Sequence, residues 1–288
     1  MNYRIVADSS SNYYELPGVS YTTVPMKIIA GDREYVDKPG LDLQGMVKDL
    51  QEYKGKSGSS CPNVQEWLEA FGDAEYVFGI TITKHLSGSF NAAQQAAQTY
   101  MEEHPGRRAY IFDSLSTGPE MMMMIVDKLT ELIGQGCDFD TIVEKVLDYS
   151  NHNHTLFCLS SLTNLARNGR VSPTVAKIAG VLGIRVVGDV KGGEITPVHK
   201  PRGEKKALQL LVEMMGERGL RQGGLIRIAH CYAEETVKAL KALVEAKYPE
   251  SPVVVERTTA LCSFYAEAGG MIIGFEGSLN EANDNRKF

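Results

Sequence analysis

The sequence predicts an α/β fold, and three observations support this class. Apolar runs rich in Val, Ile and Phe alternate with helical patterns over residues 1–150, which is typical of a mainly parallel sheet covered by helices on both faces. Several of these runs end in turns rich in Ser, Thr and Asp. In the second half, two consecutive strand patterns are joined by a tight glycine turn, which favours an antiparallel or mixed sheet. We therefore predict a three-layer N-terminal domain and a second α/β domain.

The N-terminal domain is expected to contain strands and helices in alternation. Strands are predicted from short apolar runs at residues 3–7, 24–29, 76–83 and 108–113. Helices are predicted at residues 40–53 and 64–71, from about residue 89 onward, and at 121–133 and 139–150. The polar stretch Lys56–Asn63, which contains Ser59 and Ser60, is expected to be a loop.

Three polar turns are expected to meet at one edge of the parallel sheet. They lie at residues 8–11, 86–89 and 113–118, each directly after a predicted strand. Binding sites of this architecture open at the carboxyl ends of the strands. Ser87 and Gly88 precede a helix, whose free N–H groups and dipole can hold a carboxylate or a phosphate. A plain N-cap by Ser87 or Ser89 is the alternative, and the local sequence leaves both open.

The second half is predicted as a separate domain with a different sheet. Strands are expected at residues 155–159, 184–190, 195–198, 225–230 and 253–257. Helices are expected at residues 162–167, from about 174 to 182, and at 207–216 and 234–247. The polar run Asn151-His152-Asn153-His154 interrupts both patterns, so we place the domains at residues 1–150 and 151–279, with a polar tail at 280–288.

Composition narrows the function classes. The 288 residues carry a formal charge of −6, which argues against nucleic acid as the main partner. Five scattered cysteines with no C-x-x-C suit reduced thiols in a cytoplasm and do not suggest a metal site. There is no leader pattern at the N-terminus and no apolar run near 18 residues. We expect a cytoplasmic protein without metal or cofactor, whose membrane contact is at most transient.

An ordered set of short motifs identifies a family. Along the chain these motifs are Asp8-Ser9-Ser10, Ser59-Ser60-Cys61-Pro62, Leu86-Ser87-Gly88-Ser89-Phe90, Asp113-Ser114, Leu162-Thr163-Asn164-Leu165, Gly169-Arg170-Val171-Ser172 and Arg202-Gly203. With them the chain resembles the DegV family over nearly its whole length. The resemblance implies a protein that holds a long-chain fatty acid in a tunnel between two α/β domains. It also implies that the protein has no chemistry of its own and presents the carboxyl group to a separate fatty acid kinase.

The resemblance also implies where the carboxyl group binds. It places the Ser59–Ser60 loop opposite the turn at Ser87 and Gly88. From the residues themselves we expect Ser87 and the amides of its turn to be the first donors to the carboxylate, Ser59 or Ser60 the second and Tyr265 the third. The family has a carboxylate-binding histidine in a His-x-Gly-Pro-Gly segment near the C-terminus, but residues 263–271 contain no histidine here. Tyr265 or Ala266 takes that position. The resemblance places two arginines, Arg170 and Arg202, near the mouth of the site, where they would contact the partner kinase or a phosphate. The alternative is a solvated face, with Arg170 holding the turn between the domains.

Two other functions compete with the fatty acid carrier. A hydrolase of acyl esters would use Ser87, with His85 two residues before it, but the first glycine of G-x-S-x-G is missing. A regulatory module would sense a lipid and change a protein contact. His152 and His154 have the spacing of two metal ligands on one strand face, although a polar connector is the preferred interpretation.

Overall fold

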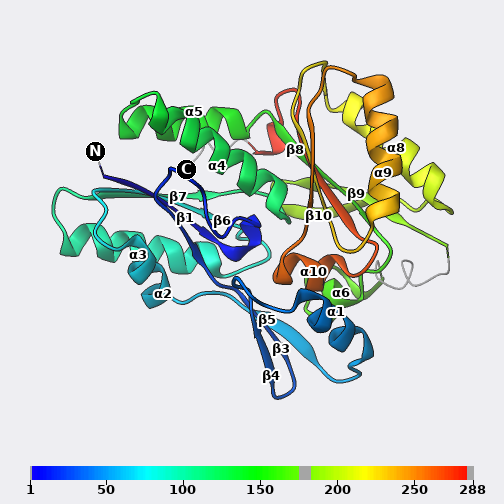
Figure 1. Cartoon of the computed structure of the whole chain (residues 1–288), viewed down its shortest axis with the longest axis horizontal. Coiled ribbons are helices and arrows are strands. Elements are labelled where there is room, and N and C mark those ends of the chain that lie inside the picture. Colours follow the sequence, from blue (N-terminus) through cyan, green and yellow to red (C-terminus); the bar gives the residue numbers. More distant parts are fainter. Residues whose placement is uncertain (1, 175–182, 284–288) are drawn as a thin grey trace.

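The computed structural model describes residues 2–174 and 183–283 of the chain (Figure 1). These residues form three sheets: a parallel four-stranded sheet, a mixed six-stranded sheet and a small three-stranded sheet. The predicted fold class, a parallel sheet in the first half and a mixed sheet in the second, is confirmed.

The parallel sheet, sheet A, lies between two layers of helices. Its strand order is β2-β1-β6-β7, and its strands are β1 (Tyr3–Asp8), β2 (Tyr21–Val24), β6 (Tyr76–Thr81) and β7 (Arg108–Asp113). Helices α2 (Val64–Phe71) and α3 (Ser89–Glu103) cover one face, where Val6 and Val77 are buried against Trp67. Helices α4 (Pro119–Gly134) and α5 (Phe139–Ser150) cover the other face. Alternate side chains of each strand thus enter different core layers.

The prediction of one strand over residues 24–29 is wrong. The chain leaves sheet A at Val24, passes Pro25 and Met26, and enters a different sheet. This sheet, sheet B, has the order β4-β3-β5 and consists of β3 (Lys27–Ala30), β4 (Arg33–Val36) and β5 (Ser57–Ser60), all antiparallel. Pro25 accounts for the change because it has no N–H group with which to continue the first ladder.

The predicted loop around Ser59 and Ser60 is also partly a strand. Ser57–Ser60 pairs with β3 over its whole length. Backbone hydrogen bonds hold this strand, and it contains no apolar residue that would produce a periodic pattern. Its four residues are half-buried.

The mixed sheet, sheet C, has the order β10-β9-β8-β13-β11-β12. Its strands are β8 (Asn153–Leu159), β9 (Val186–Lys191), β10 (Glu194–His199), β11 (Ile226–His230), β12 (Val253–Arg257) and β13 (Met271–Glu276). Among the described pairs of sheet C, β11 and β12 are parallel and the others are antiparallel. Helices α8 (Glu204–Glu217) and α9 (Glu234–Lys247) bury Leu211 and Leu240 against one face. On the other side of the sheet, α4 contacts β8, β11 and β13, so α4 lies between sheets A and C.

Several elements escaped prediction or fall outside the described residues. Strands β4 and β13 and helix α10 (Ala260–Ala266) were not predicted, while α1 (Leu43–Glu52) and α6 (Thr163–Arg167) lie close to their predicted bounds. The helix predicted up to residue 182 lies outside the described residues from residue 175 on, as does the predicted tail from residue 284 on. Helix α5 ends at Ser150 and β8 begins at Asn153, but the domain division there stays a prediction.

Within residues 2–174 and 183–283, no helix combines the length and the apolar character that crossing a bilayer requires.

Candidate functional site

The turns after β1, β6 and β7 meet at one edge of sheet A, as predicted. The buried carboxylate of Asp8 accepts hydrogen bonds from the Ile82 N–H at 3.1 Å and from the Ser89 hydroxyl at 2.8 Å. The third turn joins them through the Thr83 N–H, which donates to the Ser116 carbonyl at 3.0 Å. Burial raises the pKa of Asp8 to about 6, although these hydrogen bonds act in the opposite direction. Asp8 thus connects the turn after β1 to the turn after β6.

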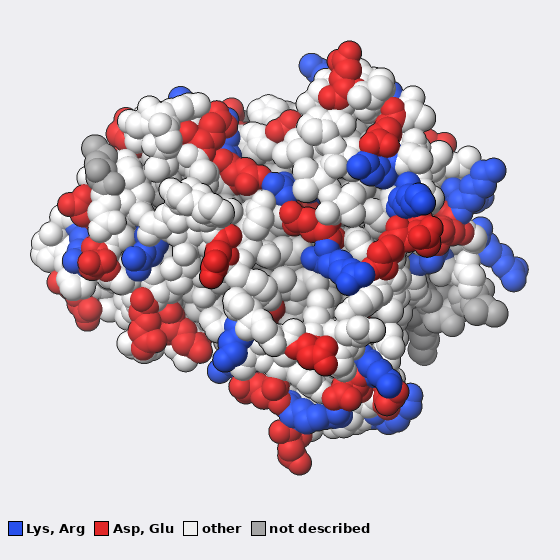
Figure 2. All heavy atoms as spheres, viewed as in Figure 1, with Lys and Arg blue, Asp and Glu red and all other residues white. Residues whose placement is uncertain are grey.

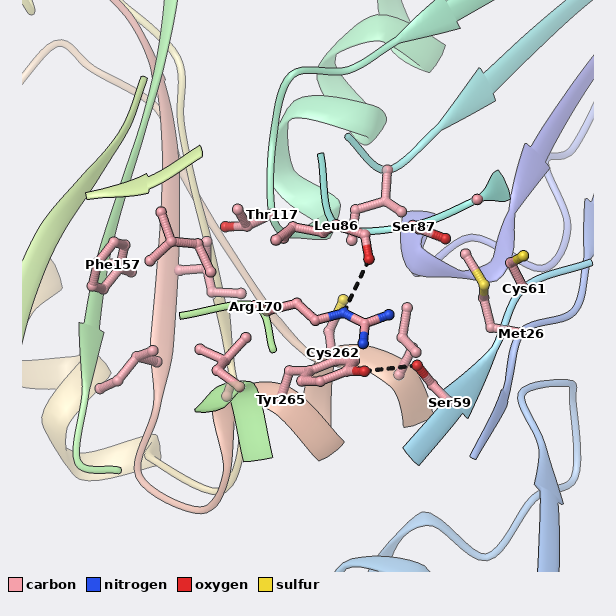
Figure 3. Close-up of a pocket in the computed structure, with 18 of the residues that line it drawn as sticks. Met26, Ser59, Cys61, Leu86, Ser87, Thr117, Phe157, Arg170, Cys262 and Tyr265 are labelled. Atoms are coloured by element: carbon pink, nitrogen blue, oxygen red, sulfur yellow. Dashed lines mark hydrogen bonds between the residues drawn. The ribbon is translucent and has the colours of Figure 1, made fainter. Parts of the chain in front are cut away.

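A pocket of about 270 Å³ opens beside this edge, between sheets A, B and C (Figure 3). Residues from both sides of the predicted domain boundary line it. The apolar lining consists of Met26, Ile82, Leu86, Phe157, Leu159, Leu165, Ile195, Leu261, Ala266 and Ile272. The remaining lining residues are Ser59, Ser60, Cys61, Ser87, Gly88, Thr117, Arg170, Cys262 and Tyr265. A mostly apolar cleft with a few convergent polar groups is the usual form of a small-molecule site.

The pocket brings together nearly all of the residues that the sequence singled out. Ser59, Ser60, Ser87, Gly88, Tyr265 and Arg170 all line it. Arg202 does not line it; this residue is exposed, and its backbone forms an isolated bridge with Ile184.

Ser87 lies just before helix α3 and lines the pocket. Its Oγ accepts the N–H of Ser89 at 3.2 Å, at the start of α3. Neither Ser87 nor Ser89 is the N-cap residue, so the plain serine N-cap is not what the structure has, and the Ser87 hydroxyl proton is available to a ligand. Gly88 follows as the N-cap residue without a side-chain hydrogen bond. A Cβ atom on Gly88 would stand 3.3 Å from the Cys61 sulfur, so any larger residue would narrow this side of the pocket.

Ser59 and Tyr265 form the second polar group. Strand β5 places Ser59 and helix α10 places Tyr265, and their hydroxyl oxygens are 2.7 Å apart (Figure 3). Either hydroxyl can donate to the other, so one proton of the pair stays free for a third partner. Of the two residues that the sequence offered in place of a histidine, Ala266 also lines the pocket, but it has no polar side chain.

Arg170 is half-buried at the pocket wall. Its Nε donates to the Leu86 carbonyl at 3.1 Å, and its guanidinium carbon lies 5.9 Å from the centre of the Tyr265 ring. Another of its nitrogens donates to the Asn168 carbonyl. Among the described residues, no Asp or Glu forms an ion pair with Arg170. A half-buried cation without a counter-ion favours an anionic ligand.

The surroundings of Ser87 give little support to a hydrolase. The Nδ1 of His85 lies 3.6 Å from a carboxylate oxygen of Glu194. In the described part of the chain, no histidine is hydrogen-bonded to Ser87. Burial raises the pKa of the Cys262 thiol well above its ordinary value, with a smaller contribution from the nearby Glu120 carboxyl group, so this pocket cysteine stays protonated.

The two histidines with metal-ligand spacing bond to the backbone. The Nε2 of His154 lies 2.9 Å from the Ser278 carbonyl oxygen, and the Nδ1 of His152 lies 2.9 Å from that of Asp148. Within the described residues, His, Cys, Asp and Glu side chains nowhere gather in a group of three or more that would hold a metal ion.

The sequence prediction missed much of the lining, and Thr117, Met26 and Cys262 show why. Thr117 had a signal, because it belongs to the hydroxyl-rich turn at residues 113–118. Met26 enters the pocket because the chain changes sheets at Pro25, and Cys262 lies on the unpredicted helix α10. No local pattern indicated either of them.

Comparison with known proteins assigns the family. Residues 2–277 match the family described as "Uncharacterised protein, DegV family". A DegV domain-containing protein of Streptococcus pneumoniae is 36% identical over 281 residues, which cover 96% of this chain and 99% of the relative. The α/β fold, the pocket and these matches define the class: this chain belongs to the DegV family.

Two solved structures resemble the chain over nearly its full length. One is the Streptococcus pneumoniae Fatty Acid Kinase (Fak) B3 protein loaded with linoleic acid, with a TM-score of 0.93, 35% identity and coverage of 96% of this chain and 100% of the other. The second is a DegV family protein from Eubacterium eligens loaded with heptadecanoic acid, with a TM-score of 0.92, 38% identity and the same coverage. Both of these neighbours carry fatty acids.

Proposed function

We propose that this chain is a non-catalytic binding protein for a long-chain fatty acid. The observation that carries the proposal is the largely apolar pocket, whose wall contains hydroxyl groups and Arg170, an arginine that has no acidic partner among the described residues. The fatty acids in the two similar structures support it. Burial contributes about 0.8 kcal/mol per CH₂, so a chain of about sixteen carbons contributes on the order of 10 kcal/mol before the costs of binding. Hydrogen bonds to the head group add about 1–3 kcal/mol. The acyl chain would provide most of the binding affinity, and the polar groups would determine the orientation of the bound fatty acid.

In this proposal the carboxylate occupies the polar side of the pocket. Its hydrogen-bond donors are the hydroxyls of Ser59, Ser60, Ser87 and Tyr265 and the backbone at Gly88. Tyr265 then performs the role of the family's histidine. Arg170 lies close enough to Tyr265 to serve the same carboxylate, or a phosphate transferred to it.

We further propose that the carboxyl group is presented to a partner fatty acid kinase in the cytoplasm. The similarity to the Fak B3 protein supports such a partner. Arg170 and Arg202 are the proposed contacts to the kinase or to phosphate. On the face drawn in Figure 2, Lys and Arg are interspersed with Asp and Glu, and the net charge is −6. A surface of this kind does not favour nucleic acid, and membrane contact is proposed to be at most transient.

Solvent extraction tests the binding function directly. Protein purified from lipid-replete cells should release a long-chain fatty acid in near-stoichiometric amount when it is denatured and extracted with organic solvent. An empty extract, combined with no binding of added linoleic acid, would contradict the proposal. Covalent labelling by a fluorophosphonate that disappears in Ser87→Ala would instead support an acyl ester hydrolase.

Ser87→Ala is expected to weaken binding of the free acid by about 1 kcal/mol. The variant removes one neutral donor while the helix keeps its other contacts. Binding of the methyl ester, which has no anionic oxygen, should be weakened less by the same variant. Titration of delipidated protein with linoleic acid and methyl linoleate measures both values. Ser150→Ala is a matched control, because Ser150 bonds to the Val146 carbonyl at the end of α5, outside the pocket. Equal free-acid affinities of wild type and Ser87→Ala would rule out this donor.

Arg202→Ala is expected to leave the bound fatty acid unchanged and to slow acyl phosphate formation by the kinase. Arg202 is exposed and does not line the pocket, so its loss removes no proposed head-group contact. Extraction of the bound lipid and initial rates with the kinase measure the two effects. Arg221→Ala, at another exposed arginine, is the control. Loss of lipid from Arg202→Ala would instead assign Arg202 to the ligand site.

A further inference from the structure

Helix α10 forms one wall of the pocket but lacks a cap of its own. It contributes Leu261, Cys262, Tyr265 and Ala266 to the lining. Its N-cap residue, Thr259, makes no side-chain hydrogen bond to the helix, and the helix is only seven residues long. Isolated helices of this length are not stable in water. The position of α10 is therefore determined by what the rest of the chain provides.

The missing cap comes from Asp37, directly after β4. Its carboxylate accepts hydrogen bonds from the Ala260 N–H at 3.2 Å and the Leu261 N–H at 3.1 Å. The Tyr14 hydroxyl donates to the same carboxylate at 2.7 Å, and Asp37 is 1% exposed. A carboxylate at this position satisfies the unpaired first-turn amides and interacts favourably with the helix dipole.

Sheet B also holds the other end of α10. Strand β5 carries Ser59, whose hydroxyl is bonded to that of Tyr265 in the last turn of the helix. Strands β4 and β5 flank β3 in the same three-stranded sheet. Ile28 of β3 packs in one buried cluster with Phe264. Sheet B and the residue directly after its strand β4 thus contact both ends of α10: Asp37 binds the first turn, and Ser59 binds the last turn.

We propose that Asp37 is a positioning residue for the ligand site. By fixing the first turn of α10, it sets the rotation of the helix and so holds the Tyr265 hydroxyl opposite Ser59. A small rotation of so short a helix would break the 2.7 Å contact between the Ser59 and Tyr265 hydroxyls. It would also move the free hydroxyl proton of this pair away from the carboxylate of the bound fatty acid. The ligand part of this inference rests on the proposed fatty acid function; the positioning of α10 does not.

The test compares Asp37→Asn with Asp138→Asn. Asp138 caps α5 by accepting the Thr141 N–H at 3.0 Å and does not line the pocket, so it is a matched control for the loss of a helix cap. Asp37→Asn places a side-chain N–H group against the groups that donate to Asp37, which are the Ala260 and Leu261 amides and the Tyr14 hydroxyl. It should lower the affinity for linoleic acid by on the order of tenfold, and that for methyl linoleate much less. The acid-to-ester ratio is the affinity for linoleic acid divided by that for methyl linoleate. In a Tyr265→Phe background, Asp37→Asn should have little further effect on this ratio.

A measurement without ligand tests the positioning of α10 by Asp37 separately from fatty acid binding. Amide hydrogen exchange in α10 should become faster in delipidated Asp37→Asn and stay unchanged in Asp138→Asn. Unchanged exchange, or an unchanged acid-to-ester ratio in folded Asp37→Asn, would overturn the positioning role. A wild type that binds no linoleic acid would overturn the proposed function, while exchange still tests the helix.

A milder variant covers the case in which Asp37→Asn does not fold. Tyr14→Phe removes only the hydroxyl that bonds Asp37. It should shift the acid-to-ester ratio in the same direction by a smaller factor, and no shift would again overturn the role.

Discussion

Glu120→Gln is expected to stabilise the protein by roughly 3–5 kcal/mol at pH 8 and above. Glu120 is 1% exposed, and neither of its carboxylate oxygens has a hydrogen-bond partner among the described residues. Burial raises its pKa from the ordinary 4.5 to about 8. Well below pH 4.5 the carboxyl is protonated in both states, and its ionisation makes no contribution to stability. As the pH rises toward 8, only the unfolded state ionises, and stability falls by about 1.4 kcal/mol per pH unit.

Chemical denaturation of delipidated protein between pH 4.5 and 9 measures this effect. Wild type and Glu120→Gln should agree at the acid end and diverge as the pH rises. Glu131→Gln is the control on the same helix, because Glu131 is exposed and pairs with Lys128 at 2.9 Å. Its loss should change stability little at any pH. Parallel stability curves for wild type and Glu120→Gln would contradict the raised pKa.

Arg170→Gln is expected to weaken linoleic acid binding by about 1.5–3 kcal/mol, which is on the order of 10–100-fold. The half-buried guanidinium has no acidic partner in the described residues, so an anionic head group would form its ion pair. Glutamine keeps a donor but removes the charge. Binding of methyl linoleate should change much less, because the ester has no charge to lose.

Titration of delipidated protein with both ligands measures the effect. Arg167→Gln is the control, because Arg167 is an exposed residue of α6 that does not line the pocket. Unchanged acid affinity together with slower phosphorylation by the kinase would assign Arg170 to the partner contact alone.

The sequence predicted elements well where one segment contained the whole signal. The ranges of α2, β7, α5, α9 and β12 agree with the structure because their apolar spacing is regular. The turn at Ser87 and Gly88 was placed correctly for a related reason: parallel strands bring their carboxyl ends to one edge. The positions of Ser59 and Arg170 came from the family resemblance.

The rest depended on contacts between distant residues. The Ser59–Tyr265 hydrogen bond spans 206 positions, and the bond from Ala260 to Asp37 spans 223. No local pattern encodes such a pair. Strand β5 escaped detection because its sequence, SGSS, contains no apolar residue. Met26 and Cys262 were missed because the chain changes sheets at Pro25 and because helix α10 was not predicted.

The contacts that the first half makes to α10 have a consequence for how the chain is assembled. Helix α10 belongs by sequence to the second half, yet its first turn is capped by Asp37, and the Asn12 side chain accepts the Thr259 N–H just before it. A fragment beginning at residue 151 would therefore lack both partners and expose unpaired amides at that turn. The first half of the chain thus supplies contacts that the second half needs to position α10. The two halves should lose structure together in a single cooperative transition, although their sheets are separate.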